Sequence, residues 1–191
     1  GLAVALAIES GATSHNRSEG ITAMLFYLIV YAVATSGSFA ALAYLAGRER
    51  EINKVEDLAG LGRIYPLISA ALALFLFSLA GLPPLAGFWG KFTLFLSALD
   101  VSSENGMERT WFLILAITAG LNAAIAAAYY LRLVAVMYFR DPVGVPQADG
   151  GAGPGLATIV AACLLIGASI VPGSLIETSG NASKSARTVH E

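Results

Sequence analysis

Long apolar runs, separated by short polar or charged stretches, make up most of the chain. A helix needs about 20 apolar residues to cross a bilayer, so the longest runs predict transmembrane helices over 21–46, 110–139 and 156–176. The opening run, 1–8, is too short to cross and has no basic region before it, so we expect it to be the tail of a truncated helix. The polar tail, 177–191, is expected to lie outside the membrane.

A fourth apolar stretch, 64–100, does not fit one regular helix. As a straight helix it would be about 54 Å long, against a hydrocarbon core of about 30 Å, and it is too short for two full spans with a turn. Pro83 and Pro84 cannot continue a helix, because proline lacks the backbone donor and clashes with the preceding turn. We therefore predict two part-helices, 64–82 and 85–100. An irregular link at membrane depth is tolerated only where it is buried in protein or lines a wet cavity.

The polar stretches between these runs predict loops at 9–20, 47–63, 100–109 and 141–155. The loop 47–63 carries four basic residues, which favours the cytoplasmic side of a membrane. Counting basic residues over all the loops favours two crossings for the broken segment, whereas its short second part favours a single crossing.

Composition supports a membrane location. Apolar residues make up 57% of the chain and charged residues 13%, against about 25% charged in a soluble domain, and the mean hydropathy is +0.72. The predicted fold class is an all-α, polytopic transmembrane helix bundle with one discontinuous helix. The net charge of −2 gives no sign of nucleic-acid binding. The sequence shows no metal-ligand spacing, phosphate-binding loop or nucleophile motif, so we expect no complete active site within this chain.

Lys91 is the only charged residue between Arg63 and Asp100. A lysine in the bilayer interior costs at least about 2.5–3.5 kcal/mol. Burial and the positive end of the second part-helix disfavour its charged form, while carbonyl groups freed at the end of the first part-helix favour it. A group balanced in this way can take and release a proton. In the alternative, the side chain snorkels toward Asp100, about 13 Å further along the helix, but snorkelling gives no reason for a Pro-Pro break.

Three further polar residues lie in the apolar runs. Tyr27 and Tyr31 are four positions apart and share a helix face; they could carry hydrogen bonds in a polar channel, although aromatic packing is the favoured interpretation. Asn122 could belong to a polar pathway, but a packing hydrogen bond is favoured. The small residues Gly37 and Ala41, also four apart, are typical of close helix packing.

Three segments together resemble a known family. Residues 78–92 read Ser-Leu-Ala-Gly-Leu-Pro-Pro-Leu-Ala-Gly-Phe-Trp-Gly-Lys-Phe, which resembles the broken helix in antiporter-like subunits of proton-pumping NADH–quinone oxidoreductase, respiratory complex I. Residues 26–40 resemble the helix before it, and 128–132 with 137–139 resemble the helix after it. The resemblance covers about residues 20–140, and the Gly-Phe-Trp-Gly-Lys-Phe form is similar to the subunit N branch.

The resemblance implies about fourteen transmembrane helices, of which this chain would be the C-terminal third, and a single crossing for 64–100. It implies that Lys91 is the catalytic residue, a terminal proton-transfer group, and that the partner residues of the first repeat lie elsewhere. It also implies no redox cofactor in this chain. The expected partners are the other membrane-arm subunits and the lipid bilayer, with quinone and NADH engaged only through other subunits. The expected location is a bacterial plasma membrane.

Two other functions stay open from the sequence. The chain could be a subunit of a multi-subunit cation/proton antiporter, which neighbouring genes would distinguish from a complex I subunit. It could also be a non-conducting membrane scaffold in which Lys91 only snorkels.

Overall fold

The computed structural model describes residues 14–46, 52, 54–99, 106–142 and 151–170. Every regular element in these ranges is a helix, which confirms the all-α fold class. The elements are α2 (Ser14–Ala46), the short 3-10 helix η1 (Val55–Leu58), α3 (Leu61–Ile64), α4 (Pro66–Ala80), α5 (Ala86–Leu99), α6 (Gly106–Phe139) and α7 (Ala152–Ile170). The predicted segments 1–8 and 177–191 lie outside the described residues.

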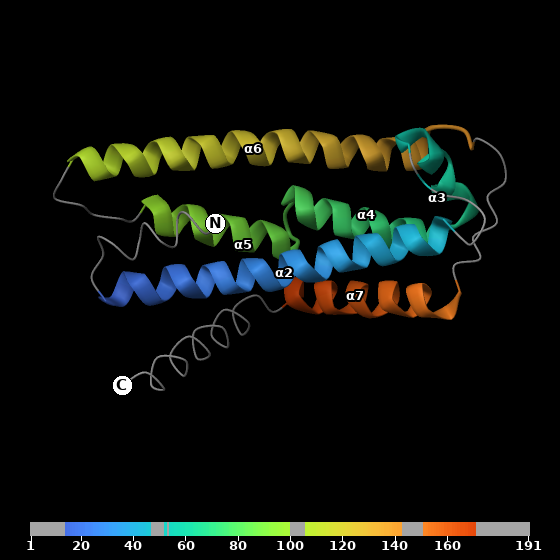
Figure 1. Ribbon diagram of the computed structural model, residues 1–191, viewed down its shortest axis with the longest axis horizontal. Helices are drawn as coiled ribbons and strands as arrows, with labels where there is room; N and C mark the ends of the chain where they lie inside the picture. The colour runs from blue at the N-terminus through green and yellow to red at the C-terminus, as the bar shows by residue number, and fades with distance from the viewer. Residues whose placement is uncertain (1–13, 47–51, 53, 100–105, 143–150, 171–191) are drawn as a thin grey trace.

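The helices run side by side in an elongated bundle (Figure 1). Helices α4 and α5 follow one another end to end, between α6 on one side and α2 on the other, and α7 packs along α2. The stretch from Pro66 to Leu99 therefore passes along the bundle once, with a break near its middle. This confirms the discontinuous helix, and the interpretation as a hairpin, which charge counting favours, is wrong.

Three of the described helices are long and apolar enough to cross a membrane. They contain the spans Met24–Ala46, Leu113–Phe139 and Ala152–Ile170, and α4 is a shorter apolar helix. Together with the broken segment they form the predicted polytopic bundle.

Several helix boundaries differ from the prediction. Helix α2 begins at Ser14, inside the predicted connector, and α6 begins at Gly106, inside the predicted polar loop. The prediction placed each helix boundary at the limit of the apolar run. The backbone bonds of a helix do not depend on that limit, so a helix can continue into the polar region beyond the hydrocarbon core. The charged loop 47–63 likewise contains η1 and most of α3.

Helix α7 begins at Ala152, whereas the sequence predicts a start at 156. Pro154 is the third residue of the helix. The first four N–H groups of a helix have no partner within it, so a proline in this turn loses no helical bond. Pro66, the first residue of α4, likewise lies in the first turn of its helix. The predicted end of this span, residues 171–176, lies outside the described residues.

Helices α2 and α4 are in close contact. At Gly37 an added Cβ would lie 2.5 Å from Cζ of Phe75, a ring that is fully buried. Ala41, one turn further, is also fully buried and packs in a core cluster with Leu72 and Leu76 of α4. The small residues on α2 thus form the close helix contact that their spacing predicts.

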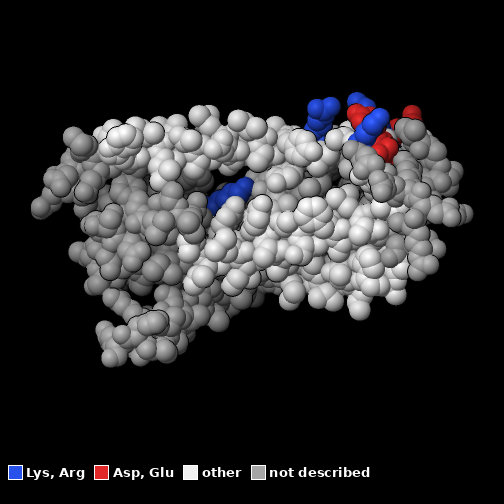
Figure 2. Space-filling view, in the orientation of Figure 1, with Lys and Arg blue, Asp and Glu red and all other residues white. Residues whose placement is uncertain are grey.

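Charged side chains gather at one end of the bundle, where η1 and α3 lie (Figure 2). Arg63 and Asp141 form an ion pair there at 3.1 Å, but both side chains are largely exposed. Such a surface pair is worth about 0–1 kcal/mol. The packing of the helices, and not this pair, therefore positions the break in α4–α5.

Candidate functional site

The break begins where α4 ends, in a left-handed turn. Gly81 has φ of +83°, a conformation that side chains disfavour. Its N–H donates to the carbonyl groups of Phe77 and Ser78, both at 3.0 Å, and the N–H of Leu82 donates to Phe77 at 3.1 Å. This turn, of the type that commonly ends helices, satisfies two of the last four carbonyl groups of α4.

Lys91 satisfies the other two. Its Nζ donates to the carbonyl oxygen of Leu79 at 2.7 Å and to that of Ala80 at 3.3 Å. The side chain is partly buried and reaches back past the start of α5, opposite to the direction that snorkelling requires. The negative end of the α4 dipole favours a cation at this position.

The start of α5 is held by two serine hydroxyl groups. The N–H of Ala86 donates to Oγ of Ser169 at 2.9 Å, and the N–H of Gly87 donates to Oγ of Ser78 at 3.2 Å. Gly87 lies so close to α4 that an added Cβ would overlap the backbone of Ser78. Polar groups from α4, α5 and α7 therefore replace the helical bonds that the break removes, as a membrane interior demands.

Lys91 lines a small cavity. The accessible volume of this cavity is about 10 Å³, which is about what one water molecule needs. It is lined by residues of α2, α4 and α5: Tyr27, Val30, Tyr31, Ala34, Ser78, Leu79, Gly87 and Lys91. Among these described lining residues, none has a carboxylate. The site therefore combines one cation, two carbonyl groups that are open in the sense of accepting no backbone N–H, and room for one water.

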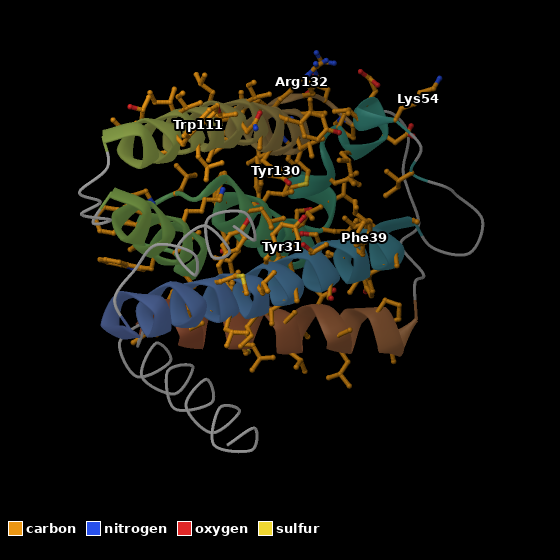
Figure 3. All side chains as sticks on the ribbon, turned by 60° about the vertical axis from the view of Figure 1, so that its left-hand side comes forward. Tyr31, Phe39, Lys54, Trp111, Tyr130 and Arg132 are labelled. Carbon is orange, nitrogen blue, oxygen red and sulfur yellow. The ribbon has the colours of Figure 1, made fainter. Side chains whose placement is uncertain are left out.

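The structure brings together Lys91, Tyr27 and Tyr31, which the sequence singles out separately. The two tyrosine rings lie 5.9 Å apart. Tyr31 lies on the side of α2 that faces α6, and Tyr130 lies on the side of α6 that faces α2 (Figure 3). Asn122 is exposed on α6 and is not among the residues that line the cavity.

Two residues at the break carry no role in the sequence analysis, Ser78 and Ser169. Ser78 belongs to the conspicuous segment around the two prolines. A hydroxyl group one turn before the break could have been predicted from the sequence to bond a backbone group there. Ser169 lies in an unremarkable apolar run, and its partner Ala86 is 83 positions away. No local pattern identifies it.

In the space-filling view, a basic group shows in a recess between helices near the middle of the molecule, apart from the charged end (Figure 2). Across the described residues, no three His, Cys, Asp or Glu side chains gather in a way that could hold a metal ion. The arrangement at the break can hold a proton on an amine next to a water site.

These features define a class: a multi-pass integral membrane protein whose broken helix presents an inward-facing lysine at the break. Discontinuous helices with open backbone groups near the midplane are typical of proteins that transport ions. The family model described as NADH:quinone oxidoreductase/Mrp antiporter, transmembrane, matches residues 10–122. The chain belongs to this family.

Similar proteins carry more specific names. The chain is 34% identical over 160 residues to NADH-quinone oxidoreductase subunit N of Paramagnetospirillum magneticum, covering 84% of this chain and 31% of that protein. It is 43% identical over 122 residues to subunit N of Granulibacter bethesdensis, covering 64% and 24%. Among solved structures, a chain of respiratory complex I from Thermus thermophilus with bound aureothin superposes with a TM-score of 0.66 at 32% identity, covering 92% of this chain and 36% of that one. The chain thus spans about a third or less of the length of these relatives.

Proposed function

We propose that this chain is part of the proton-translocating membrane subunit of a complex I-type NADH–quinone oxidoreductase, and that Lys91 is a proton-transfer residue in it. The names of the similar proteins support the assembly. The observation that carries the role of Lys91 is the position of its Nζ, hydrogen-bonded to the open carbonyl groups of Leu79 and Ala80 beside a one-water cavity.

Counting hydrogen-bond donors supports proton transfer at this amine. An ammonium group has three N–H donors, and two of them suffice for the carbonyl groups of Leu79 and Ala80. The third is free to donate to a water in the cavity. When the water takes that proton and passes one on to an acceptor beyond the cavity, the neutral amine keeps two N–H groups for the same two carbonyls. The proton can therefore move without leaving a backbone group unpaired.

The tyrosines on α2 extend the site. Tyr27 and Tyr31 line the same cavity as Lys91, and a phenol both donates and accepts hydrogen bonds. We propose that their hydroxyl groups orient the cavity water toward the amine. No redox cofactor is proposed for this chain, and in this proposal NADH and quinone react in other subunits.

The test distinguishes the loss of a titratable proton at residue 91 from the loss of its hydrogen bonds to the break. Lys91→Gln, made in the full-length subunit, keeps N–H donors for the break but has no group that titrates, and Lys91→Arg keeps the charge but does not release it. We expect both variants to assemble and to lose NADH-driven proton pumping, measured with a pH-sensitive dye in inverted membrane vesicles. Lys54→Gln, at an exposed lysine of the charged end, is the control and should pump normally. Normal pumping by an assembled Lys91→Gln complex would refute the role of Lys91.

An antiporter subunit is the second candidate, because the description of the matching family also covers Mrp antiporters. The two are distinguished by the driving force. Vesicles that acidify with NADH as the only energy source support the oxidoreductase, whereas proton movement that requires a sodium gradient and is indifferent to NADH supports the antiporter.

A further inference from the structure

The role proposed for Lys91 does not explain the hydrogen bond between α7 and the start of α5. Ser169 lies near the end of α7, and its Oγ accepts the N–H of Ala86 at 2.9 Å. Ala86 is fully buried, so water cannot take the place of this acceptor. Ser169 thus supplies the first N–H group of α5 with a partner from a different helix.

The hydroxyl group of Ser169 is itself fixed. It donates to the carbonyl oxygen of Leu165, four positions earlier, at 2.8 Å. This bond uses the only hydrogen of the hydroxyl group and leaves its lone pairs for Ala86. Leu165 is also buried and belongs to the same core cluster as Ala86 and Phe75. The acceptor is therefore aimed at the break by packing as well as by its own hydrogen bond.

The start of α5 in turn determines where Lys91 lies, since the lysine is between one and two turns further along the same helix. The weaker of its two hydrogen bonds, to Ala80, already measures 3.3 Å. If the first turn of α5 moves away from α7, this bond is the first to be lost.

We infer that Ser169 is a positioning residue for Lys91: its hydroxyl group fixes the first turn of α5 from α7 and so keeps the lysine amine on the carbonyl groups at the end of α4. The inference rests on the proton-transfer role proposed for Lys91. It makes α7, which lines no part of the described cavity, a component of the site.

The test uses the full-length subunit in its assembled complex. Ser169→Ala removes the acceptor, and Ser169→Thr restores a hydroxyl group that can make the same bond to the carbonyl four positions earlier. Thr158→Val is the matched control, because Thr158 is on the same helix, is fully buried and bonds to Pro154 four positions earlier, but has no bond to the break. The measurements are the amount of assembled complex on native gels and the protons pumped per NADH oxidised.

We expect Ser169→Ala to assemble normally and to pump roughly threefold to tenfold fewer protons per NADH. The loss of one hydrogen bond lowers the equilibrium constant for the position in which Lys91 meets the carbonyl groups by about this factor. Ser169→Thr should restore pumping, and Thr158→Val should pump as the unmodified complex does. Normal pumping by Ser169→Ala, or less complex with unchanged pumping in each complex, would overturn the inference.

Two further comparisons keep the result interpretable. If Ser169→Ala does not assemble, Ser169→Cys, which has a similar size and a weaker acceptor, should assemble and show intermediate pumping; full pumping by this variant would overturn the inference. Lys91→Gln separates this inference from the proposed function. Loss of pumping in Lys91→Gln with normal pumping in Ser169→Ala refutes only the role of Ser169, whereas normal pumping in Lys91→Gln refutes the function itself.

Discussion

Gly87 is the position at which a single methyl group should disturb the site most. An alanine Cβ there would lie 2.7 Å from the carbonyl carbon of Ser78 and 2.8 Å from its Oγ, and would overlap its carbonyl oxygen. Carbon atoms in contact need about 3.5–4.0 Å. The atoms in the way belong mostly to the backbone of α4, which cannot rotate aside. In Gly87→Ala, α5 must therefore move away from α4 by about 1 Å, the difference between these separations.

A shift of this size has calculable consequences. The bond from Lys91 to Ala80, at 3.3 Å, and that from Gly87 to Ser78, at 3.2 Å, both exceed hydrogen-bond length after it. Overpacking costs about 1–3 kcal/mol, and each lost hydrogen bond about 0.5–1.5 kcal/mol. The better helix propensity of alanine returns about 0.8–1.0 kcal/mol. The net destabilisation of the break is about 1–5 kcal/mol, and a misplacement of about 1 Å at a reacting group can lower its rate about a hundredfold.

The assay compares proton pumping per NADH oxidised with the amount of assembled complex. We expect Gly87→Ala to pump at least about tenfold less, since part of the calculated loss of alignment falls on the amine. Gly120→Ala on α6 is the control, because an added Cβ there meets no described atom within 4 Å, and it should pump normally. If Gly87→Ala assembles and pumps normally, the link between the close contact of α4 with α5 and the position of Lys91 is refuted.

Two other substitutions test the cavity and the contact between α2 and α4. Tyr31→Phe removes a hydroxyl group from the cavity but keeps the ring, so pumping should fall severalfold with normal assembly. Tyr44→Phe, near Gly155 and away from the cavity, is the control and should leave pumping unchanged. Equal effects in the two variants would contradict a role for the hydroxyl group of Tyr31. Gly37→Ala presses on the buried ring of Phe75 and should lower stability by about 1–3 kcal/mol, seen as a lower thermal midpoint of the detergent-solubilised complex. An unchanged midpoint would contradict the close contact of α2 with α4.

The sequence predicts the broken helix and its position because the reasons are local. Pro83 and Pro84 cannot continue a helix, and the length of an apolar run against bilayer thickness limits how the segment can cross. The exact end was missed, because α4 stops at Ala80, two residues before the predicted end at 82, in the left-handed turn at Gly81. The lysine is conspicuous for the same kind of reason, as the only charge in a long apolar stretch. Even the pairing of Tyr27 with Tyr31 follows from helical spacing alone.

The direction in which Lys91 points is not local, and neither is the partner of Ala86. A flexible lysine can reach along its helix either way, and the choice depends on which carbonyl groups the turn at Gly81 leaves open. The helix starts at Ser14 and Gly106 were missed because hydropathy marks the edge of the hydrocarbon and not the end of the backbone bonding.

The hydrogen bonds at the break limit how the site can work. The last four carbonyl groups of α4 are all paired, two by the turn and two by Lys91, and the first two N–H groups of α5 are paired by serines. Swinging the two part-helices apart would leave several of these groups unpaired in an apolar interior, at about 1–3 kcal/mol for each. Moving one proton between the amine and the cavity water leaves all of them paired. The bonding at the break therefore favours a mechanism in which the proton and the water move while the helices stay in place.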